Sequence, residues 1–430
     1  MSKYSTFATM DKPKENNNNY DLIVIGAGAA GLIAAGVAGR IGKNILVLEK
    51  MRTVGRKMLI SGKGRCNITN DNYASHHFKK IHPRGRFLKT AYKQFFKDDI
   101  LEILRSENIE VKTERGQRVF PVSDKSKDVV NALIHWAFIK NVQLITNAGV
   151  KKILVESGAV TGVEYEQNGR LRKVNTKSVI LATGGKSYPA TGSTGDGYAL
   201  AKSVGHKITP PLPSLVPLET EGNLAQQLMG LSLKNANASL WIDEKKASEE
   251  FGEMIFTHFG LSGPVILTLS RQAVLALEKK QKVEISIDIK PALDFDKLDK
   301  RLLRDLNENG KKQIYNLLKL WMPSKLIKPM MTICSISPEK QAHQITAEER
   351  KKLRLNLKNL RFKITKSRSF KEAIITQGGI NLDEINPKTM ESKLIKGLFF
   401  AGEVIDLDAD TGGYNFQIAY STGSLAAENA

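Results

Sequence analysis

With 430 residues, 41% of them hydrophobic and 25% charged, the chain is too long for one hydrophobic core and ordinary in composition for a soluble globular protein of two or three domains. Sixty-five Lys and Arg against 44 Asp and Glu leave a formal charge of +21, which favours polyanionic partners, nucleic acid before anionic membrane, unless it only reflects a basic proteome or a need for solubility. The two cysteines, Cys66 and Cys334, exclude a disulfide framework and a zinc site, so we expect no metal centre and a cytoplasmic protein.

The N-terminal part of the chain predicts a polar leader followed by a βαβ unit. Residues 1–19 are polar and lack the apolar core of a signal peptide, so we expect them to be disordered. Asp21–Ile25 is a short apolar run typical of a strand buried on both faces, Ala30–Arg40 is a helix of small residues, and Asn44–Glu49 is the next strand. The uncharged run Leu22–Gly39 has the length of a membrane span, but its glycines would weaken a lone helix, so we expect no membrane insertion.

The rest of the chain predicts a fold that is interrupted and then completed. In chain order we expect helices at Arg86–Ser106 and Ser126–Lys140, short strands from Val142 to Asn175, a buried strand at Ser178–Ala182, β-like alternation from Ser214 to Ile289, helices from Ala292 to about Leu360, buried strands at Ala373–Thr376 and Gly397–Ala401, and a last helix at Asn415–Glu428. Four prolines between Pro210 and Pro217 mark the start of the interruption.

Gly26-Ala-Gly28-Ala-Ala-Gly31 is a G-x-G-x-x-G motif in the context of a dinucleotide site, because it follows a buried strand and opens a helix. One glycine makes the turn, another lets the backbone approach a pyrophosphate, and the third lets the helix pack on the sheet. The free N–H groups and the dipole of the helix then receive the phosphates. Glu49, at the end of the next strand, can accept hydrogen bonds from an adenosine ribose and would repel the 2′-phosphate of NADP.

Three further segments carry a resemblance to a known family. They are Gly55-Arg-Lys57 with Ser61–Asn70, Ala182–Gly185 running into Gly192–Tyr198, and Phe400–Glu403 with Asp406 and Thr411–Asn415. Together with Phe256–Pro264 they resemble the BaiN/RdsA family of NAD(P)/FAD-dependent oxidoreductases, also labelled aminoacetone oxidase-like flavoproteins, over Tyr20 to Ala430. The resemblance implies FAD as the bound cofactor. No second G-x-G-x-x-G with a spaced acid is visible, so NAD(P)H is expected only as a transient electron donor.

The fold that this resemblance implies is α/β, with an FAD-binding two-dinucleotide-fold domain like the Rossmann domain of glutathione reductase. We expect that domain at residues 20–210 and 366–430, and an inserted domain at residues 211–365. Within the insertion, a β-rich, barrel-like part at 211–291 is expected to precede a helical subdomain at 292–360.

The resemblance also implies most of the flavin-binding residues. The glycines after Thr411 would turn their amides to the pyrimidine edge of the flavin, and Glu403 would contact ribityl or ribose hydroxyls, with Asp406 as the alternative. Arg56, Lys57 and Lys63 would offset pyrophosphate charge, unless they contact RNA or lie in a solvated loop. The full set expected to bind the cofactor is Gly26, Gly28, Ala29, Ala30, Gly31, Glu49, Lys50, Arg56, Lys57, Gly64, Arg65, Cys66, Val150, Thr183, Gly184, Gly402, Glu403, Asp406, Gly412, Gly413 and Asn415.

Cys66 is the sharpest catalytic candidate. It lies in the segment that resembles the flavin-facing loop, and Arg65 beside it is expected to lower the pKa of its thiol. The thiol would give a proton to a substrate carbon while the flavin delivers hydride to the adjacent one; the alternative is a small buried hydrophobe beside the ring. His258 is the second candidate, either to orient or protonate a substrate or as a structural residue. Cys334 lies among Met330 and Met331 and is expected to pack in a core.

Basic residues cluster in two blocks, at 40–97 and at 350–371, the second without any acid. A basic rim on a flavin site suits a substrate embedded in a polyanion, although the second block can also be a solvated face. The resemblance implies reduction of a uridine in large-subunit ribosomal RNA to dihydrouridine, with the base unstacked to meet the flavin. The alternatives are a small-molecule flavoenzyme, as an amine oxidase or enone reductase, and a flavin-bearing RNA-binding factor whose redox activity is incidental.

Overall fold

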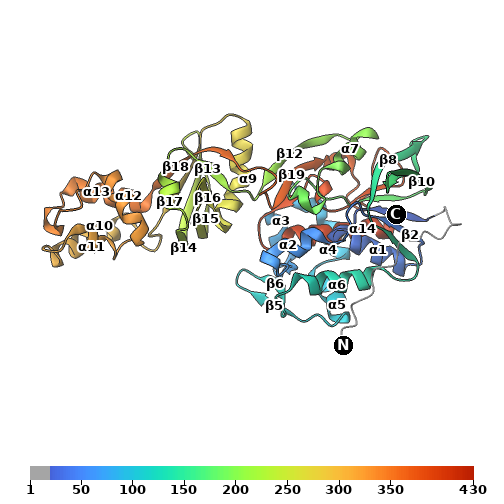
Figure 1. The fold of residues 1–430 in the computed structure, drawn as a ribbon, viewed down its shortest axis with the longest axis horizontal. Helices are drawn as coiled ribbons and strands as arrows, with labels where there is room; N and C mark the ends of the chain where they lie inside the picture. The colour runs from blue at the N-terminus through green and yellow to red at the C-terminus, as the bar shows by residue number, and fades with distance from the viewer. Residues whose placement is uncertain (1–19) are drawn as a thin grey trace. The chain divides into compact units, whose positions relative to one another are not determined.

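The computed structural model describes residues 20–430, and the predicted leader of residues 1–19 lies outside this range. The described chain divides into a first unit, residues 20–212 and 374–430, and an inserted unit, residues 213–373 (Figure 1). The insertion therefore ends at Ala373, later than the expected 365. The reason is that β18 (Leu360–Ser367) still belongs to the sheet of the inserted unit.

A five-stranded parallel sheet forms the centre of the first unit, in the order β20-β11-β1-β2-β7. Its strands are β1 (Leu22–Ile25), β2 (Ile45–Leu48), β7 (Val142–Ile145), β11 (Val179–Leu181) and β20 (Leu398–Phe400). Every residue of β1, β2, β11 and β20 is buried, which explains why these strands are continuous apolar runs rather than alternating ones. The pairing of β20 with β11 shows that the C-terminal segment completes the sheet, as predicted.

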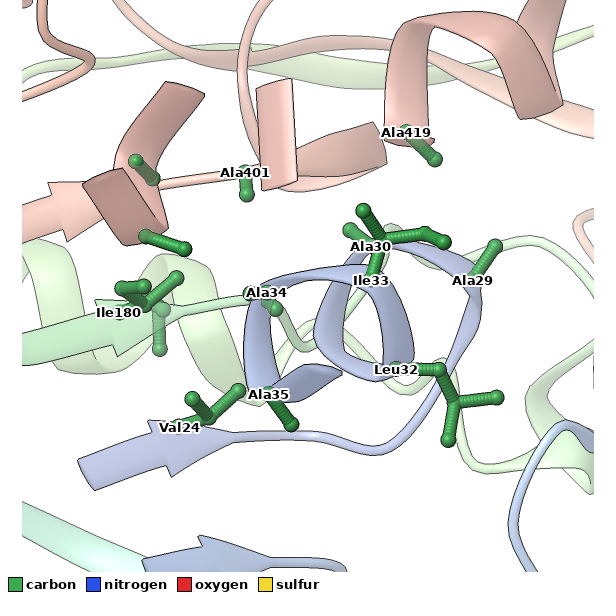
Figure 2. Packing of buried hydrophobic residues seen from close by; sticks show 14 of the residues in the cluster. Val24, Ala29, Ala30, Leu32, Ile33, Ala34, Ala35, Ile180, Ala401 and Ala419 are labelled. Atoms are coloured by element: carbon green, nitrogen blue, oxygen red, sulfur yellow. The ribbon is translucent and has the colours of Figure 1, made fainter. Parts of the chain in front are cut away.

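Small residues let two helices approach this sheet and each other. Helix α1 (Ala29–Arg40) follows β1, and α14 (Tyr414–Asn429) packs on α1; Figure 2 shows α1 between Val24 of β1 and Ala419 of α14. A Cβ at Gly423 of α14 would lie 2.4 Å from the carbonyl oxygen of Ala30, so only glycine permits this contact between the two backbones. The density of Gly and Ala in both helices therefore serves packing inside a protein.

Smaller sheets and helices complete the first unit. The sheets are β8 (Ala148–Glu156), β9 (Ala159–Gln167) and β10 (Arg170–Asn175); β3 (Thr69–Asn70), β6 (Arg118–Pro121) and β5 (Val111–Glu114); β12 (Ile208–Ser214) with β19 (Ile375–Ile380); and β4 (Ile81–His82) with β21 (Asp408–Ala409). The helices are α2 (Arg56–Gly64), α3 (Ala74–Lys80), α4 (Lys89–Gln94), α5 (Lys97–Ser106), α6 (Ser126–Ala137) and α7 (Asp196–Ser203), with 3-10 turns η1 (Gly85–Leu88), η2 (Pro189–Thr191), η4 (Leu382–Glu384) and η5 (Gly402–Val404).

The helix expected at Arg86–Ser106 is broken in the structure. It consists of η1, α4 and α5, and Phe95 and Phe96 separate the last two in extended conformation. The backbone N–H of Phe96 donates to the carboxylate of Asp99 at 2.6 Å, a capping contact that starts a new helix. Buried residues recur at helical spacing on both sides of this break, so periodicity alone predicted one helix.

The inserted unit contains a closed antiparallel barrel and a run of helices, as predicted, but the last barrel strand, β18, comes after these helices in the chain. The barrel order is β13-β16-β15-β14-β17-β18, with β13 (Leu218–Thr220), β14 (Ser232–Ile242), β15 (Lys245–Phe256), β16 (Gly260–Ser262) and β17 (Val283–Asp288). Its helices are α8 (Leu224–Gln227), α9 (Pro264–Glu278), α10 (Phe295–Glu308), α11 (Ile314–Leu318), α12 (Ser324–Cys334) and α13 (Ala347–Lys358), with η3 (Ala342–Gln344). Cys334 is fully buried in the core of this unit, with Met330 and Trp321, which confirms its packing role. None of the helices within residues 20–430 has the length and apolar character to cross a bilayer.

Candidate cofactor and active site

The three glycines after β1 differ in the way that a pyrophosphate site requires. Gly26 has a φ of +99°, and a Cβ there would lie 2.6 Å from the carbonyl oxygen of Ala182, so glycine makes this turn. A Cβ at Gly31 would lie 1.9 Å from the carbonyl oxygen of Gly26, so glycine also sets the close packing of α1. At Gly28 a Cβ would meet nothing within 4 Å, which leaves open space beside the backbone. The loop therefore fits a phosphate group at Gly28.

The N-terminus of α1 faces this open space without a protein cap. Gly28 is its N-cap residue, no side chain of the described residues bonds to its first turn, and that turn holds no acid. The amides of Ala29 and Ala30 therefore remain donors for an anion. Glu49, at the end of β2, accepts from the N–H of Ala27 at 2.8 Å and from that of Met51 at 2.8 Å. Burial raises the pKa of Glu49, and these two N–H groups oppose the rise.

A cavity of about 510 Å³ lies next to Lys50, the residue that follows Glu49. Its lining residues come from the turn after β2, from the β8–β9 hairpin and from α7: Lys50, Asn147, Gly149, Val150, Lys151, Glu166, Asp196, Ala199, Leu200 and Ser203. Lys50 bonds to Asp196 and Thr194 at its edge. The cavity is in the size range of ligand sites and contains two of the predicted residues, Lys50 and Val150. It has the room that an adenosine needs.

Thr183 and Gly184 follow β11 and face the same loop region. Gly184 has a φ of +72°, so the chain turns sharply there. The hydroxyl of Thr183 is buried and has no hydrogen-bond partner among residues 20–430. A buried hydroxyl without a partner costs roughly 1–3 kcal/mol, which a polar atom of a bound cofactor would recover. This unsatisfied donor and the open space at Gly28 both indicate that the first unit is shaped around a ligand.

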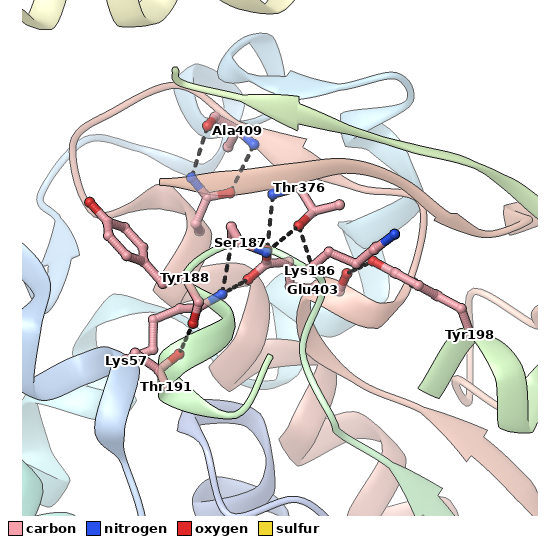
Figure 3. Close-up of polar contacts among 10 residues, drawn as sticks. Lys57, Lys186, Ser187, Tyr188, Thr191, Tyr198, Thr376, Glu403 and Ala409 are labelled. Carbon is pink, nitrogen blue, oxygen red and sulfur yellow. Dashed lines mark hydrogen bonds and ion pairs between the residues drawn. The ribbon is translucent and has the colours of Figure 1, made fainter. Parts of the chain in front are cut away.

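A second polar cluster links Lys57, Ser187, Thr376 and Glu403 (Figure 3). Lys57 Nζ donates to Glu403 Oε2 at 2.7 Å and to Ser187 Oγ at 2.9 Å. The second Glu403 oxygen accepts from Ser187 Oγ at 2.8 Å and from the N–H of Thr376 at 2.9 Å. The prediction placed Lys57 against the pyrophosphate and Glu403 on sugar hydroxyls. In the structure these two charges bond to each other, a long-range pairing that no local pattern signals.

Cys66 is buried, and the guanidinium of Arg65 pairs with another residue. Arg65 turns away to Glu114, with Nη1 2.8 Å from Oε1, and its guanidinium lies 4.1 Å from the centre of the Phe120 ring. The Cys66 side chain is 0% exposed, and burial raises the pKa of its thiol to about 12. The prediction that Arg65 lowers this pKa was therefore wrong. The arrangement matches the alternative, a small buried residue.

The loop before α14 is held by three asparagine side chains, of which the prediction named only Asn415. Asn67 accepts from the N–H of Gly413 at 3.0 Å and donates to the carbonyl of Thr69 at 3.1 Å. Asn70 donates to the carbonyl of Gly412 at 2.9 Å, and Asn415 closes the loop on Ala409 with two bonds of 2.8 and 2.9 Å. A Cβ at Gly413 would lie 2.4 Å from atoms of Thr69, so glycine is required there. The amide of Gly413, expected to face the flavin, is therefore engaged by Asn67.

The other predicted residues fall into different places. Arg56 donates to the carbonyl of Ala190 at 3.1 Å, and Lys63 and Gly64 are exposed at the irregular end of α2. Gly402 donates its N–H to Thr422 of α14, and the N–H of Asp406 bonds to Ile380. His258 is exposed in the inserted unit, with its ring 4.9 Å from that of Phe259. No group of three or more His, Cys, Asp or Glu within residues 20–430 is arranged to hold a metal ion.

The basic block at 350–371 is largely compensated by acids from other elements. Seven of its ten basic residues form salt bridges: Arg350 and Arg354 with Asp299, Lys358 with Asp288, Arg361 with Glu284, Lys363 with Glu221, and Lys366 and Arg368 with Glu219. These acids lie far away in sequence, so the sequence of the block alone suggests a free cationic face that the folded chain largely neutralises.

Comparisons with known proteins agree with this site. A family model described as the HI0933-like protein Rossmann domain matches residues 20–429. The chain belongs to this family. It is an FAD-dependent oxidoreductase, which confirms the family and the enzyme class that the sequence implied.

Three curated relatives match nearly the whole chain. The chain is 29% identical to a 3-dehydro-bile acid delta(4,6)-reductase of Clostridium scindens, over 95% of this chain and 98% of the relative. It is 28% identical to a ribosomal RNA dihydrouridine synthase of Escherichia coli, over 95% and 98%. It is 30% identical to a protein of the same name from Haemophilus influenzae, over 94% and 97%. The names of these relatives divide between an RNA substrate and a small molecule.

Proposed function

We propose that the protein reduces a uridine of ribosomal RNA to dihydrouridine, with FAD as its bound redox group and NAD(P)H as the electron source. The observation that favours RNA over a metabolite is charge: the chain carries a formal +21, which suits a polyanionic substrate. Two of the full-length relatives bear the name of this activity. The proposal places the protein in the cytoplasm.

The residues of the chain would hold and orient the cofactor. The open space at Gly28 and the amides of Ala29 and Ala30 would bind the pyrophosphate, and Glu49 the adenosine ribose. The cavity lined by Lys50 and Val150 would take the adenine. Bound FAD supplies hydride transfer between the donor and the substrate.

We propose that the proton for the second carbon of the base comes from a group other than Cys66, because the Cys66 side chain is 0% exposed. Titratable side chains gather at Asp410, just before the glycine loop of α14. Lys80 Nζ lies 3.0 Å and His82 Nε2 3.7 Å from the Asp410 carboxylate. We propose that one of these three side chains is the proton donor.

The test is a mass-spectrometric count of dihydrouridine in ribosomal RNA from cells that lack the gene. One uridine position should lose the modification, and the wild-type gene should restore it. Purified protein with NADH or NADPH should form the same product in RNA transcribed without modifications. Dihydrouridine that is unchanged at every position refutes the proposal.

The second candidate is a small-molecule reductase, because the bile-acid reductase is as similar to the chain as the RNA-modifying relatives are. It predicts that a conjugated enone rapidly oxidises the reduced bound flavin when no RNA is present. Reduction of the flavin by NADH or NADPH, followed by mixing with an enone or with RNA, separates the two candidates.

A further inference from the structure

Residues 72–97 of the first unit form a basic segment that contains seven Lys or Arg and no Asp or Glu. Three of these residues have acidic partners elsewhere: Lys80 with Asp410, Arg84 with Asp383, and Lys97 with Asp71. The other four, Lys79, Arg86, Lys89 and Lys93, are exposed and have no acidic partner among residues 20–430. Unlike the block at 350–371, this segment keeps more than half of its basic residues free for an anionic partner.

An exposed aromatic residue begins the same segment. Tyr73 precedes α3 and is 82% exposed, and Lys97 Nζ lies 5.9 Å from the centre of its ring. His76, one turn further along, is also exposed, and its ring stacks on Tyr414 with centres 6.2 Å apart and planes inclined by 28°. A single exposed aromatic side chain is ordinary, but an aromatic with a cation near its ring and a second exposed ring one turn away has the composition of a base-stacking surface.

A buried histidine fixes this surface on the first unit. His77 is fully buried, its Nε2 lies 3.1 Å from the carbonyl oxygen of Asn70, and its ring makes edge contacts with Tyr92, Phe96 and Tyr414. These contacts join α3 to α4 and to the start of α14; all three helices are labelled in Figure 1. Tyr73 and His76 are therefore presented by a rigid scaffold.

The position of Tyr414 connects this surface to the cofactor site. Tyr414 directly follows Gly412 and Gly413, which Asn70 and Asn67 hold in the loop that the family resemblance places at the flavin. His76 stacks on Tyr414, so the stacking surface begins one ring away from that loop. A nucleotide on this surface would lie close to a base that has been turned into the active site.

We propose that Tyr73 and His76 form a stacking platform for an unpaired base of the RNA substrate, while the exposed Lys79, Arg86, Lys89 and Lys93 bind neighbouring phosphates. The inference rests on the proposed RNA substrate. Unpaired bases are the part of RNA that proteins stack on aromatic rings, and their phosphates supply the charge that this acid-free segment matches. A stacked neighbour would hold the strand open beside the target uridine.

The test measures binding of a fluorescently labelled oligouridine to the FAD-loaded protein by anisotropy at fixed salt. Tyr73→Ala should weaken binding by about ten-fold to a hundred-fold, and Tyr73→Phe should retain it, because stacking needs only the ring. The double variant Lys89→Glu and Lys93→Glu should weaken binding and reduce its salt dependence. Phe251→Ala, which removes a 56% exposed aromatic of the inserted unit, and the double variant Lys351→Glu and Lys352→Glu are the matched controls and should bind as the wild type does.

A normal flavin spectrum in each variant shows that it is folded. Tyr73→Ala that binds oligouridine as tightly as the wild type, or the same loss in the control variants, overturns the proposal. So does a wild-type protein that binds vesicles of phosphatidylglycerol through these residues and does not bind oligouridine. If Tyr73→Ala loses binding but the wild type forms no dihydrouridine, the proposed reaction fails and the platform stands. If Tyr73→Ala forms dihydrouridine at the wild-type rate and KM, the platform fails and the reaction stands.

Discussion

Replacing Gly28 by Ala separates the cofactor role of the glycine loop from its structural role. The backbone of Gly28 is extended, with φ −83° and ψ −166°, and a Cβ there would contact no atom of the protein within 4 Å. An alanine is therefore free of strain, and the loss of unfolded-state freedom should stabilise the apoprotein by about 0.4–1 kcal/mol. The methyl group would, however, occupy the space in which a phosphate approaches the amides of α1.

The expected loss of FAD affinity follows from the contacts that the methyl group displaces. One hydrogen bond from an amide to a charged phosphate oxygen contributes about 1.5–3 kcal/mol. Losing one such bond weakens binding roughly 10- to 150-fold. Gly31→Ala should behave differently, because its Cβ would lie 1.9 Å from the carbonyl oxygen of Gly26, so that α1 has to move and the apoprotein loses about 1–3 kcal/mol or more.

Urea unfolding of flavin-free protein and titration with FAD, followed by flavin fluorescence, measure the two effects. Gly310→Ala is the control, since its Cβ would have only ordinary contacts of 3.5 Å in the inserted unit. If Gly28→Ala binds FAD within two-fold of the wild type, or destabilises the apoprotein as much as Gly31→Ala does, the assignment of the phosphate to Gly28 is refuted.

Three further predictions concern buried ionisable groups. Burial raises the Cys66 pKa from 9.0 to about 12, so the unfolded chain loses this proton first as pH rises, and the stability from the neutral thiol is lost between pH 9 and 12. Cys66→Ala should remove this alkaline loss in urea unfolding and should keep the pH profile of activity. A shifted activity profile would restore a catalytic role. Burial lowers the pKa of His77 from 6.5 to about 4, so the unfolded chain takes up this proton first as pH falls. The free energy of unfolding should therefore fall by about 2–3 kcal/mol from pH 6.5 down to 4. His77→Phe should flatten this part of the stability curve, and an unchanged curve contradicts the neutral histidine. Lys57→Met leaves the Glu403 carboxylate, whose side chain is 10% exposed, without its counterion and should lower the free energy of unfolding by about 1–3 kcal/mol. Adding Glu403→Gln in the same chain should recover most of this loss. Additive losses in this double-mutant cycle would mean that the pair is not coupled.

The fold was predictable because its signals are local. Continuous apolar runs such as Leu22–Ile25 mark strands buried on both faces, and the proline-rich stretch from Pro210 marks the point where the chain leaves the first unit. The end of the insertion was misplaced because β18 closes the barrel by pairing with β13 and β17, which no feature of its own residues reveals. The break at Phe95 and Phe96 was missed for a related reason, since a capping contact interrupts a helix without changing its hydrophobic period.

The candidate site was predictable in its cofactor loop and less so in its side chains. Glycine spacing carries the backbone requirement directly, because the turn at Gly26 and the close packing at Gly31 each exclude a Cβ, while Gly28 leaves open space beside the backbone. Asn67 and Asn70 lie within Ser61–Asn70, a segment that carried the family resemblance. Their side-chain amides can bond a backbone loop, and this was the signal that could have predicted their contacts. The Lys57–Glu403 pair had no such signal.

By itself, the sequence predicted an interrupted α/β protein with a dinucleotide-binding loop, because periodicity and glycine spacing are properties of neighbouring residues. Its motif segments carried the resemblance to one flavoprotein family. The tertiary structure alone decided which charges are free and which groups titrate. Glu219 compensates Lys366 and Arg368 from β13, which is distant in sequence, and burial makes Cys66 a neutral thiol. Pairing and desolvation depend on segments that meet only after folding, so the charge of a residue type says little about the charge that its surface presents.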